Sequence, residues 1–356
     1  MKRILILASV AILVASCGKD STQVVGEKNR IKTYSASELT SQIDQRNTPF
    51  IFDTKGKATD LTYTLMAVAE PPEVGSTGTT YATSIHKEGS LVYVTWHTKN
   101  APFGGAVSVY DVSTPGAISY ISRVDFIDTD FHDGVYYNDG ANKYFYVVGQ
   151  RDRNVGAYYN DSVWHFGAIF GRITLTGTGD LTSTYSELPL AGHAGNGVAL
   201  GADYANMQVI TGDSASTVYK INGSTMSKID STSAALWDGE YIFSDGTDFY
   251  AFFGKNKFGT QASLKQYSYS DNVFASSATP SSPSWASVDV NFSTEDVERN
   301  AMTVDASGVA YLAMGDNGVV TVDGSTVKQH VSTYGGEARS VTVNGDTVYV
   351  ANGETN

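Results

Sequence analysis

Apolar and polar residues alternate along most of the chain in short segments that end at Gly, Asp or Asn. Six segments are alike, because each has an apolar strand, a turn and a second strand that often centres on an aromatic residue. This alternation is typical of β-hairpins. The copies are TSIHKEGSLVYVTW, DGVYYNDGANKYFYVVG, NGVALGADYANMQVITGD, DGEYIFSDGTDFYAFFG, AMTVDASGVAYLAMGDNGVVTVDGSTV and SVTVNGDTVYVANGETN.

The spacing of the copies predicts the architecture. One residue takes the same place in each copy, and we call these residues the equivalent positions. Successive equivalent positions are 39 to 63 residues apart. They are Ile85, Val135, Val198, Tyr241, Met302 and Val341. A four-stranded blade of a β-propeller takes about 40 to 50 residues. A β-sandwich would not repeat one hairpin six times. We therefore predict an all-β fold, a β-propeller of six blades with loop insertions.

Closure of the ring needs strands from both ends of the chain. The last copy stops after two strands, and two strand-like segments, TPFIFD and DLTYTLMAVAE, come before the first copy. We predict that these N-terminal strands close the last blade and cover its open edges. A seven-bladed ring, in which they form an extra blade, is the alternative.

The N-terminus has the pattern of a secretory signal peptide. Lys2 and Arg3 precede an apolar run over residues 4–14, and small residues lead to Cys17. The run is shorter than the ~20 residues of a spanning helix. We therefore assign residues 1–16 to the signal peptide, 17–47 to a polar tether that begins at Cys17, and 48–356 to the propeller domain.

The segment VASC resembles the lipobox of bacterial lipoproteins. That resemblance implies cleavage before Cys17 and lipid on its sulfur, which would attach the protein to a membrane. The following GKD is similar to the signal that sends Bacteroidetes lipoproteins to the cell surface, although a generic linker would have the same composition. We expect the outer membrane as location, with the periplasmic and surface faces both open.

Composition and charge narrow the candidate partners. The chain has 35 Gly and 22 Tyr, a single cysteine and a formal net charge of −13. One cysteine allows no disulfide framework, and a negative field repels phosphate backbones. We therefore expect no nucleic-acid partner.

One segment carries a second family resemblance. GGAVSVYDVSTPGAISYISRVDF, residues 104–126, has an alternating strand, a Val-Ser-Thr-Pro turn and a second strand, and it resembles the LVIVD type of propeller repeat. NGVVTVDGSTV is similar to the centre of that repeat. The resemblance implies a propeller outside the cytoplasm and no particular chemistry.

Signatures of catalysis are absent from the sequence. It has no Gly-x-Ser-x-Gly elbow, no His-Glu-x-x-His and no phosphate-binding Gly-rich loop, and we expect no cofactor. The segment DTDFHDG supplies three carboxylates near a Gly turn, Asp128, Asp130 and Asp133, which makes it a weak calcium candidate. Its spacing is one residue off that of a calcium loop.

The residues just before the innermost strand of each blade should meet at the mouth of the central channel. Their amide, acid, guanidinium and imidazole groups could hold a sugar or a peptide terminus. The alternative, favoured because buried polar groups normally pair, is that they satisfy one another around water. These channel-mouth residues are His132, Asp133, His193, Asn196, Asp238, Glu298, Arg299, Asn300, Glu337 and Arg339.

A second candidate surface is the insertion over residues 152–167. Aromatic side chains crowd it, and aromatics on loops contact sugars or proteins, or else fold inward and cover the blades. The residues are Tyr158, Tyr159, Trp164, His165 and Phe166.

These observations favour a non-enzymatic function. We predict a lipid-anchored propeller that binds or scaffolds a protein or glycan ligand at the cell envelope. One alternative is a glycan-directed hydrolase or lyase with acidic residues at the channel mouth, which would need paired carboxylates at a defined separation. The other is a structural subunit of an outer-membrane assembly, which would show a large exposed apolar patch.

Overall fold

The computed structural model of the chain is built almost entirely from antiparallel strands. It describes residues 23–24, 30–39, 42–50, 63–74, 80–98, 103–114, 116–151, 167–192, 194–201, 206–212, 217–233, 239–244, 248–253, 263–268, 301–305, 307–313, 315, 318–323, 326–331, 336–345 and 347–355. One α-helix, α1 (Ala36–Leu39), occurs in these residues. No helix in the described ranges is long and apolar enough to span a bilayer. The predicted all-β class is confirmed.

Two five-stranded sheets form the best-described part of the fold. In the first, the order is β2-β8-β7-β6-β5, and in the second it is β1-β12-β11-β10-β9. The strands of the first sheet are β5 (Thr80–Glu88), β6 (Leu91–Thr98), β7 (Gly105–Asp111), β8 (Ser119–Phe126) and β2 (Ile31–Ser35). Those of the second are β9 (Thr129–Asn138), β10 (Lys143–Arg151), β11 (Ala168–Leu175), β12 (Leu181–Pro189) and β1 (Gln23–Val24).

The remaining sheets have two to four strands each. The third is β13 (Ala194–Leu200), β14 (Asn206–Gly212), β15 (Thr217–Asn222) and β16 (Ser227–Ser233). The fourth is β17 (Gly239–Ser244), β18 (Asp248–Phe253) and β19 (Ser263–Ser268). The fifth is β20 (Met302–Val304), β21 (Ala310–Ala313), β22 (Val319–Asp323) and β23 (Thr326–Val331). Two hairpins complete the set: β24 (Gly336–Asn344) with β25 (Thr347–Thr355), and β3 (Ile43–Phe50) with β4 (Tyr63–Ala69).

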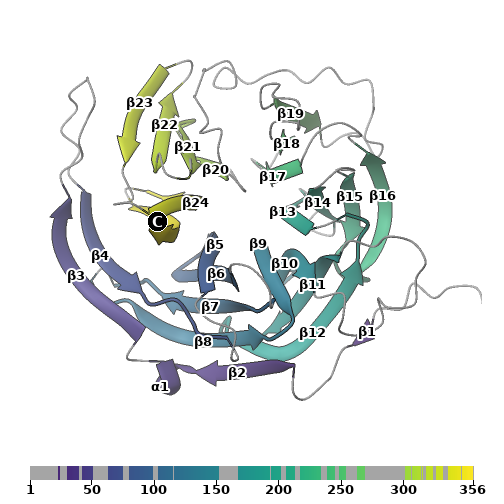
Figure 1. Cartoon of the computed structure of the whole chain (residues 1–356), viewed down its shortest axis with the longest axis horizontal. Helices are drawn as coiled ribbons and strands as arrows, with labels where there is room; N and C mark the ends of the chain where they lie inside the picture. The colour runs from purple at the N-terminus through teal and green to yellow at the C-terminus, as the bar shows by residue number, and fades with distance from the viewer. Residues whose placement is uncertain are drawn as a thin grey trace, which may run out of the picture.

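The sheets surround a common centre (Figure 1). The strands nearest that centre are β5, β9, β13, β17, β20 and β24. Apart from the added outer strands β1 and β2, each is the first strand of its sheet in chain order. Each of them carries one of the six equivalent positions predicted from the repeated hairpins. A radial set of antiparallel sheets around an axis is the arrangement of a β-propeller.

The core lies between neighbouring sheets. Tyr93 of the first sheet stacks on Phe145 of the second with ring centroids 4.8 Å apart, and Phe126 meets Phe131 edge to face at 4.8 Å. All four side chains are fully buried within one cluster. Such aromatic pairs contribute about 0.5–1.5 kcal/mol each beyond the area they bury, so these contacts fix the angle between the two sheets.

The start of the chain differs from the predicted tether. Within residues 17–47, β1 pairs with β12 and β2 pairs with β8, so this segment adds an outermost strand to two sheets. Strands therefore occur within the segment predicted as a tether, and the domain boundary at residue 48 stays a prediction. The strand was missed because Ile31 and Tyr34 are its only large apolar residues, and two such residues are too few to show a period.

The segment SASEL holds the short helix α1. Ser35 donates from its backbone N to Glu38 Oε2 at 2.9 Å and from Oγ to the same atom at 2.8 Å. These bonds form part of a capping box, and the backbone bond is the main reason why the pKa of Glu38 lies below its usual value. The helix ends at Leu39, and Ile43 already belongs to β3.

A buried group of four charged residues attaches this N-terminal segment to the second sheet. Arg30 forms ion pairs with Asp128 and with Glu187, while Arg151 pairs with Glu187 at 2.9 Å and with Asp128 at 3.5 Å. Each side chain is only 3–4% exposed. We call these residues, Arg30, Asp128, Arg151 and Glu187, the buried quartet. Its two positive and two negative charges balance, which is what burial of charge requires.

The sheets that should close the ring remain separate. In the described ranges β24 and β25 form a two-stranded sheet, as do β3 and β4, and an isolated antiparallel bridge joins Ala338 of β24 to Gly315. The two hairpins nevertheless contribute to one core cluster, which includes Ala351 of β25 as well as the partly buried Ile43, Ala69 and Tyr349.

Candidate functional site

The start of β24 places a guanidinium at the centre of the ring. Arg339 donates from Nη2 to Glu337 Oε2 at 2.8 Å and from Nη1 to His97 Nε2 at 3.0 Å. The side chains of Arg339 and Glu337 are 11% and 21% exposed. Arg339 also lies over the ring of Tyr81, with 5.9 Å between its Cζ and the ring centroid. The last sheet is thus linked to β5 and β6 of the first.

Two histidines, His97 and His132, connect this contact to the second and third sheets. The rings of His97 and His132 meet edge to face with centroids 5.7 Å apart, and His132 Nδ1 lies 3.3 Å from Asn196 Oδ1. An arginine only donates and an amide oxygen only accepts. His97 Nε2 therefore accepts, and His132 Nδ1 carries the proton. We call Glu337, Arg339, His97, His132 and Asn196 the rim cluster.

A second set of hydrogen bonds involves the residues that follow Arg339 in β24 and His132 in β9. The backbone N of Ile85 donates to Ser340 Oγ at 3.3 Å, and Ser84 Oγ donates to Asp133 Oδ1 at 2.6 Å. Asp133 also accepts from the backbone N of Gly134 at 2.8 Å and of Val198 at 2.9 Å. This central belt joins β24, β5, β9 and β13, so one buried carboxylate holds three neighbouring sheets in register.

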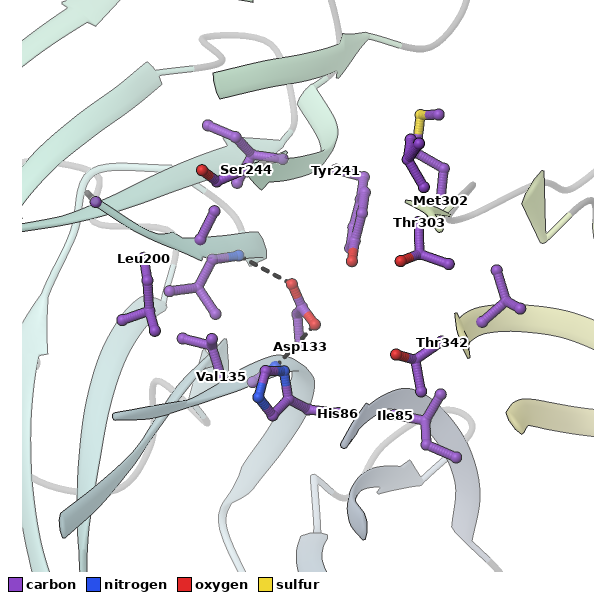
Figure 2. A pocket seen from close by; sticks show the side chains of 17 residues that line it. Ile85, His86, Asp133, Val135, Leu200, Tyr241, Ser244, Met302, Thr303 and Thr342 are labelled. Atoms are coloured by element: carbon purple, nitrogen blue, oxygen red, sulfur yellow. Dashed lines mark hydrogen bonds between the residues drawn. The ribbon is translucent and has the colours of Figure 1, made fainter. Parts of the chain in front are cut away.

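Beside the belt lies a cavity of about 350 Å³. All six equivalent positions line it, which confirms that the repeated hairpins converge at one place. The polar lining consists of Asp133, His86, Tyr241, Ser244, Thr303 and Thr342 (Figure 2). A volume of this size is within the range of small-molecule sites.

Burial keeps the titratable groups of the cavity neutral. Desolvation lowers the pKa of His86 to about 4, so its imidazole is uncharged at neutral pH. Desolvation, and then the negative charge of Asp133, raise the pKa of Tyr241 well above its ordinary value. Both side chains can therefore donate and accept hydrogen bonds without carrying charge.

The structure brings together five of the ten predicted channel-mouth residues. His132, Asn196, Glu337 and Arg339 belong to the rim cluster, and Asp133 lies in the central belt. The other five lie outside the described residues: His193, Asp238, Glu298, Arg299 and Asn300. The aromatic insertion, with Tyr158, Tyr159, Trp164, His165 and Phe166, also lies outside them, as does Cys17.

The three carboxylates of the weak calcium candidate point to different partners. Asp128 belongs to the buried quartet, whereas Asp130 accepts from Thr98 and from the backbone N of Gly104. Asp133 turns to the centre of the ring. In the described ranges no group of three His, Cys, Asp or Glu side chains is arranged to hold a metal ion.

Sequence reasoning missed two histidines of the site. His97 lies on β6, the second strand of its sheet, opposite Tyr81, and the search for channel residues covered only the innermost strands. His86 follows the equivalent position Ile85 within β5, in a place expected to carry packing residues. A search extended to the second strand would have included His97.

Comparisons with known proteins assign no family to the chain. No family model matches the chain, and no curated protein matches it. The resemblance to LVIVD-type repeats therefore stays a prediction.

Solved structures similar to the chain have a sequence identity of about 10% with it. The structure of the Dos1 propeller has 10% identity over 76% of this chain, with a TM-score of 0.37, and the match covers 65% of that chain, just under two thirds. The β-propeller domain of the Trilobed protease from Pyrococcus furiosus has 9% identity, with coverage of 74% and 89% and a TM-score of 0.37. A putative 6-phosphogluconolactonase from Bacteroides uniformis has 11% identity, with coverage of 87% and 88% and a TM-score of 0.47. Likeness at this level carries no argument about activity.

Proposed function

We propose that this protein is a lipid-anchored β-propeller of the bacterial cell envelope that binds or scaffolds a protein or glycan at the centre of its ring. One observation carries the proposal: polar side chains from non-adjacent strands of four sheets converge beside a cavity. A ring supplies such convergence and an isolated hairpin does not. The anchor is supported by the signal peptide and lipobox pattern that end at Cys17, and the LVIVD-like segment supports a place outside the cytoplasm.

The ring in this proposal has six blades. The hairpin β3–β4 completes the sixth blade as its outer half, with β24–β25 as the inner half. Support comes from Ile43 and Ala69, which pack in the same core cluster as Tyr349 and Ala351. Exposed strand edges invite aggregation, so joining these hairpins would protect both.

The pairing of the acids favours binding over catalysis. Glu337 is held by Arg339, and Asp133 accepts three hydrogen bonds that fix the belt. A general acid or base must exchange protons with a substrate, whereas both of these carboxylates have structural bonds to break first. A structural subunit of an assembly gains no support, since large exposed apolar side chains in the described ranges are scattered at Val68, Ile127 and Ile229.

The anchor is tested by Cys17→Ser, which removes the only sulfur that can carry lipid. The wild-type protein should partition into detergent, and the variant should remain uncleaved or soluble. Ser9→Ala, a change within the apolar run that leaves Cys17 in place, is the matched control. Unchanged detergent partitioning of Cys17→Ser would overturn the lipid anchor.

The binding role is tested on glycan and peptide arrays with the detergent-solubilised full chain. His132→Ala and Asn196→Ala should lose the array ligand at a temperature well below their own melting temperatures, whereas Lys32→Ala, a control at an exposed residue of β2, should keep it. The proposal fails if no ligand is found, or if both variants bind as the control does.

A further inference from the structure

The central cavity contains polar side chains that the protein itself leaves unsatisfied. In the part of the chain that the structure describes, the side chains of His86, Tyr241, Thr303 and Thr342 have no hydrogen-bond partner. They come from four different sheets, and all four line the one cavity. All four side chains are partly buried, and polar groups that turn from bulk water into a cavity normally bond to protein, ligand or ordered water. These groups therefore define a place where something with complementary hydrogen bonds is held.

The lining also restricts the charge of an occupant. Asp133 is the one carboxylate among the described lining residues, which include neither Lys nor Arg. The remaining polar groups are hydroxyls and an imidazole that burial keeps neutral. A phosphate or carboxylate would meet a negative charge without a cation to balance it. The cavity is thus suited to a molecule without negative charge.

Shape and hydrogen-bonding pattern select within the uncharged molecules. Figure 2 shows Thr303 and Thr342 on one side of the cavity and the Tyr241 hydroxyl directed toward the side of Asp133. Hydroxyls both donate and accept, so their natural complement is a molecule with several hydroxyls. The aliphatic part of the wall, which includes Ile85, Val135 and Met302, suits the carbon faces of a ring. About 350 Å³ holds one such ring and not a long chain.

We propose that the central cavity binds a neutral polyhydroxylated ring of monosaccharide size, with His86, Tyr241, Thr303 and Thr342 as its hydrogen-bonding residues. This inference rests on the proposed binding function and names its ligand class. The ring is either a free sugar or the terminal unit of a glycan. The rim cluster lies one step along the same strands from Asp133, so it would contact whatever extends from the bound ring.

Saturation-transfer NMR with the detergent-solubilised full chain tests this inference. The probes are glucose, galactose, mannose and myo-inositol, with glucose 6-phosphate and glucuronate as anionic counterparts. At least one neutral probe should bind, and its anionic counterpart should bind at least tenfold more weakly. Methyl glycosides separate the two sources: equal binding of a methyl glycoside indicates a terminal glycan unit, and its loss indicates a free sugar.

Variants locate the binding in the cavity. Thr342→Val and Thr303→Val keep the shape of the side chain and remove its hydroxyl, so each should raise the Kd by about 3- to 10-fold, the effect of one neutral hydrogen bond. Thr33→Val makes the same change at an exposed residue of β2 and should leave the Kd unchanged. Melting temperatures show whether each variant is folded.

Three outcomes would overturn the inference: no neutral probe binds, the anionic probes bind equally well, or the cavity variants bind like Thr33→Val. In the first case the cavity holds water only. The proposed function fails separately, because a peptide ligand that depends on His132 and Asn196 would support it even when every sugar fails.

Discussion

The guanidinium of Arg339 donates from Nη1 to Nε2 of His97 at 3.0 Å, across 242 positions of sequence. This contact joins β24, the innermost strand of the last sheet, to β6 in the first. It also fixes the protonation state of His97, because an arginine cannot accept a hydrogen bond. The same guanidinium also donates to Glu337, so one side chain holds two neighbours in place.

Replacement of Arg339 tests whether the rim cluster is structural. Arg339→Ala should lower the free energy of unfolding by about 1–3 kcal/mol, because it leaves Glu337 without its cation. The loss should be smaller than the 3–5 kcal/mol of a fully buried pair, since water reaches both side chains. Urea denaturation measures it. Glu337→Gln in the same background should recover part of the loss, and an unfolding free energy equal to that of the wild type would show that the cluster is not structural.

His86 should make the protein less stable in acid. Its pKa in the folded protein, about 4, lies below the unfolded value of about 6.5. The unfolded state therefore binds the proton more readily, and the contribution of His86 to stability, complete above pH 6.5, is lost as the pH falls toward 4. The loss is at most about 3 kcal/mol, because part of the ring faces the cavity, where water can screen it.

A comparison of the wild type with His86→Gln separates the pH dependence caused by His86 from that caused by the carboxylates, which both proteins share. The difference between their unfolding free energies, measured by urea denaturation at several pH values, should change steadily between pH 6.5 and 4. Parallel curves over this range would contradict the assignment.

The buried quartet should make Arg30 one of the most sensitive residues outside the ring centre. Arg30→Ala removes one of two cations and leaves Asp128 and Glu187 with Arg151 alone, so we expect a loss of about 3–5 kcal/mol in unfolding free energy. Lys32→Ala, two residues along at an exposed site, should change it by less than about 0.5 kcal/mol. Thermal and urea unfolding measure both, and equal effects of the two changes would remove the special role of the quartet.

Closure of the ring is tested by removal of β3 and β4. Deletion of residues 43–70 exposes the cluster that holds Tyr349 and Ala351 and should cause aggregation, seen by size-exclusion chromatography with light scattering. Phe50 pairs with Tyr63, so replacing residues 51–62 with a short Gly-Ser turn should keep both strands and leave a monomer. A monomeric deletion variant with unchanged melting would show that the ring closes otherwise.

The strands and their convergence were predictable because they follow from local pattern. Alternation with Gly turns indicates hairpins, and the equivalent positions, such as Ile85 and Val198, line one cavity because each hairpin enters the ring in the same way. Within the site, His132 and Asn196 were found from their places before these positions.

The partners of these residues were not predictable, because the curvature of the ring sets them. Arg30 meets Glu187 across 157 positions, and no local pattern indicates that distance. Thr303 and Thr342 gave no signal, since threonine is common in strands for its β-branched shape. Only the folded chain shows that both line the same cavity.

The attachment of the N-terminal strands to the outer sheet edges has a mechanical consequence. A force that pulls the chain from its N-terminal side reaches Arg30 and β2 before any other part of the first sheet. β2 and β5 are the two outermost members of one sheet, with β8, β7 and β6 between them. Tension from that side would therefore load the outer strand β2, and the Arg30–Asp128 ion pair would carry part of it to the start of the innermost strand β9. In the proposed function, attachment at the N-terminal side would thus be mechanically coupled to the strand that carries His132 and Asp133.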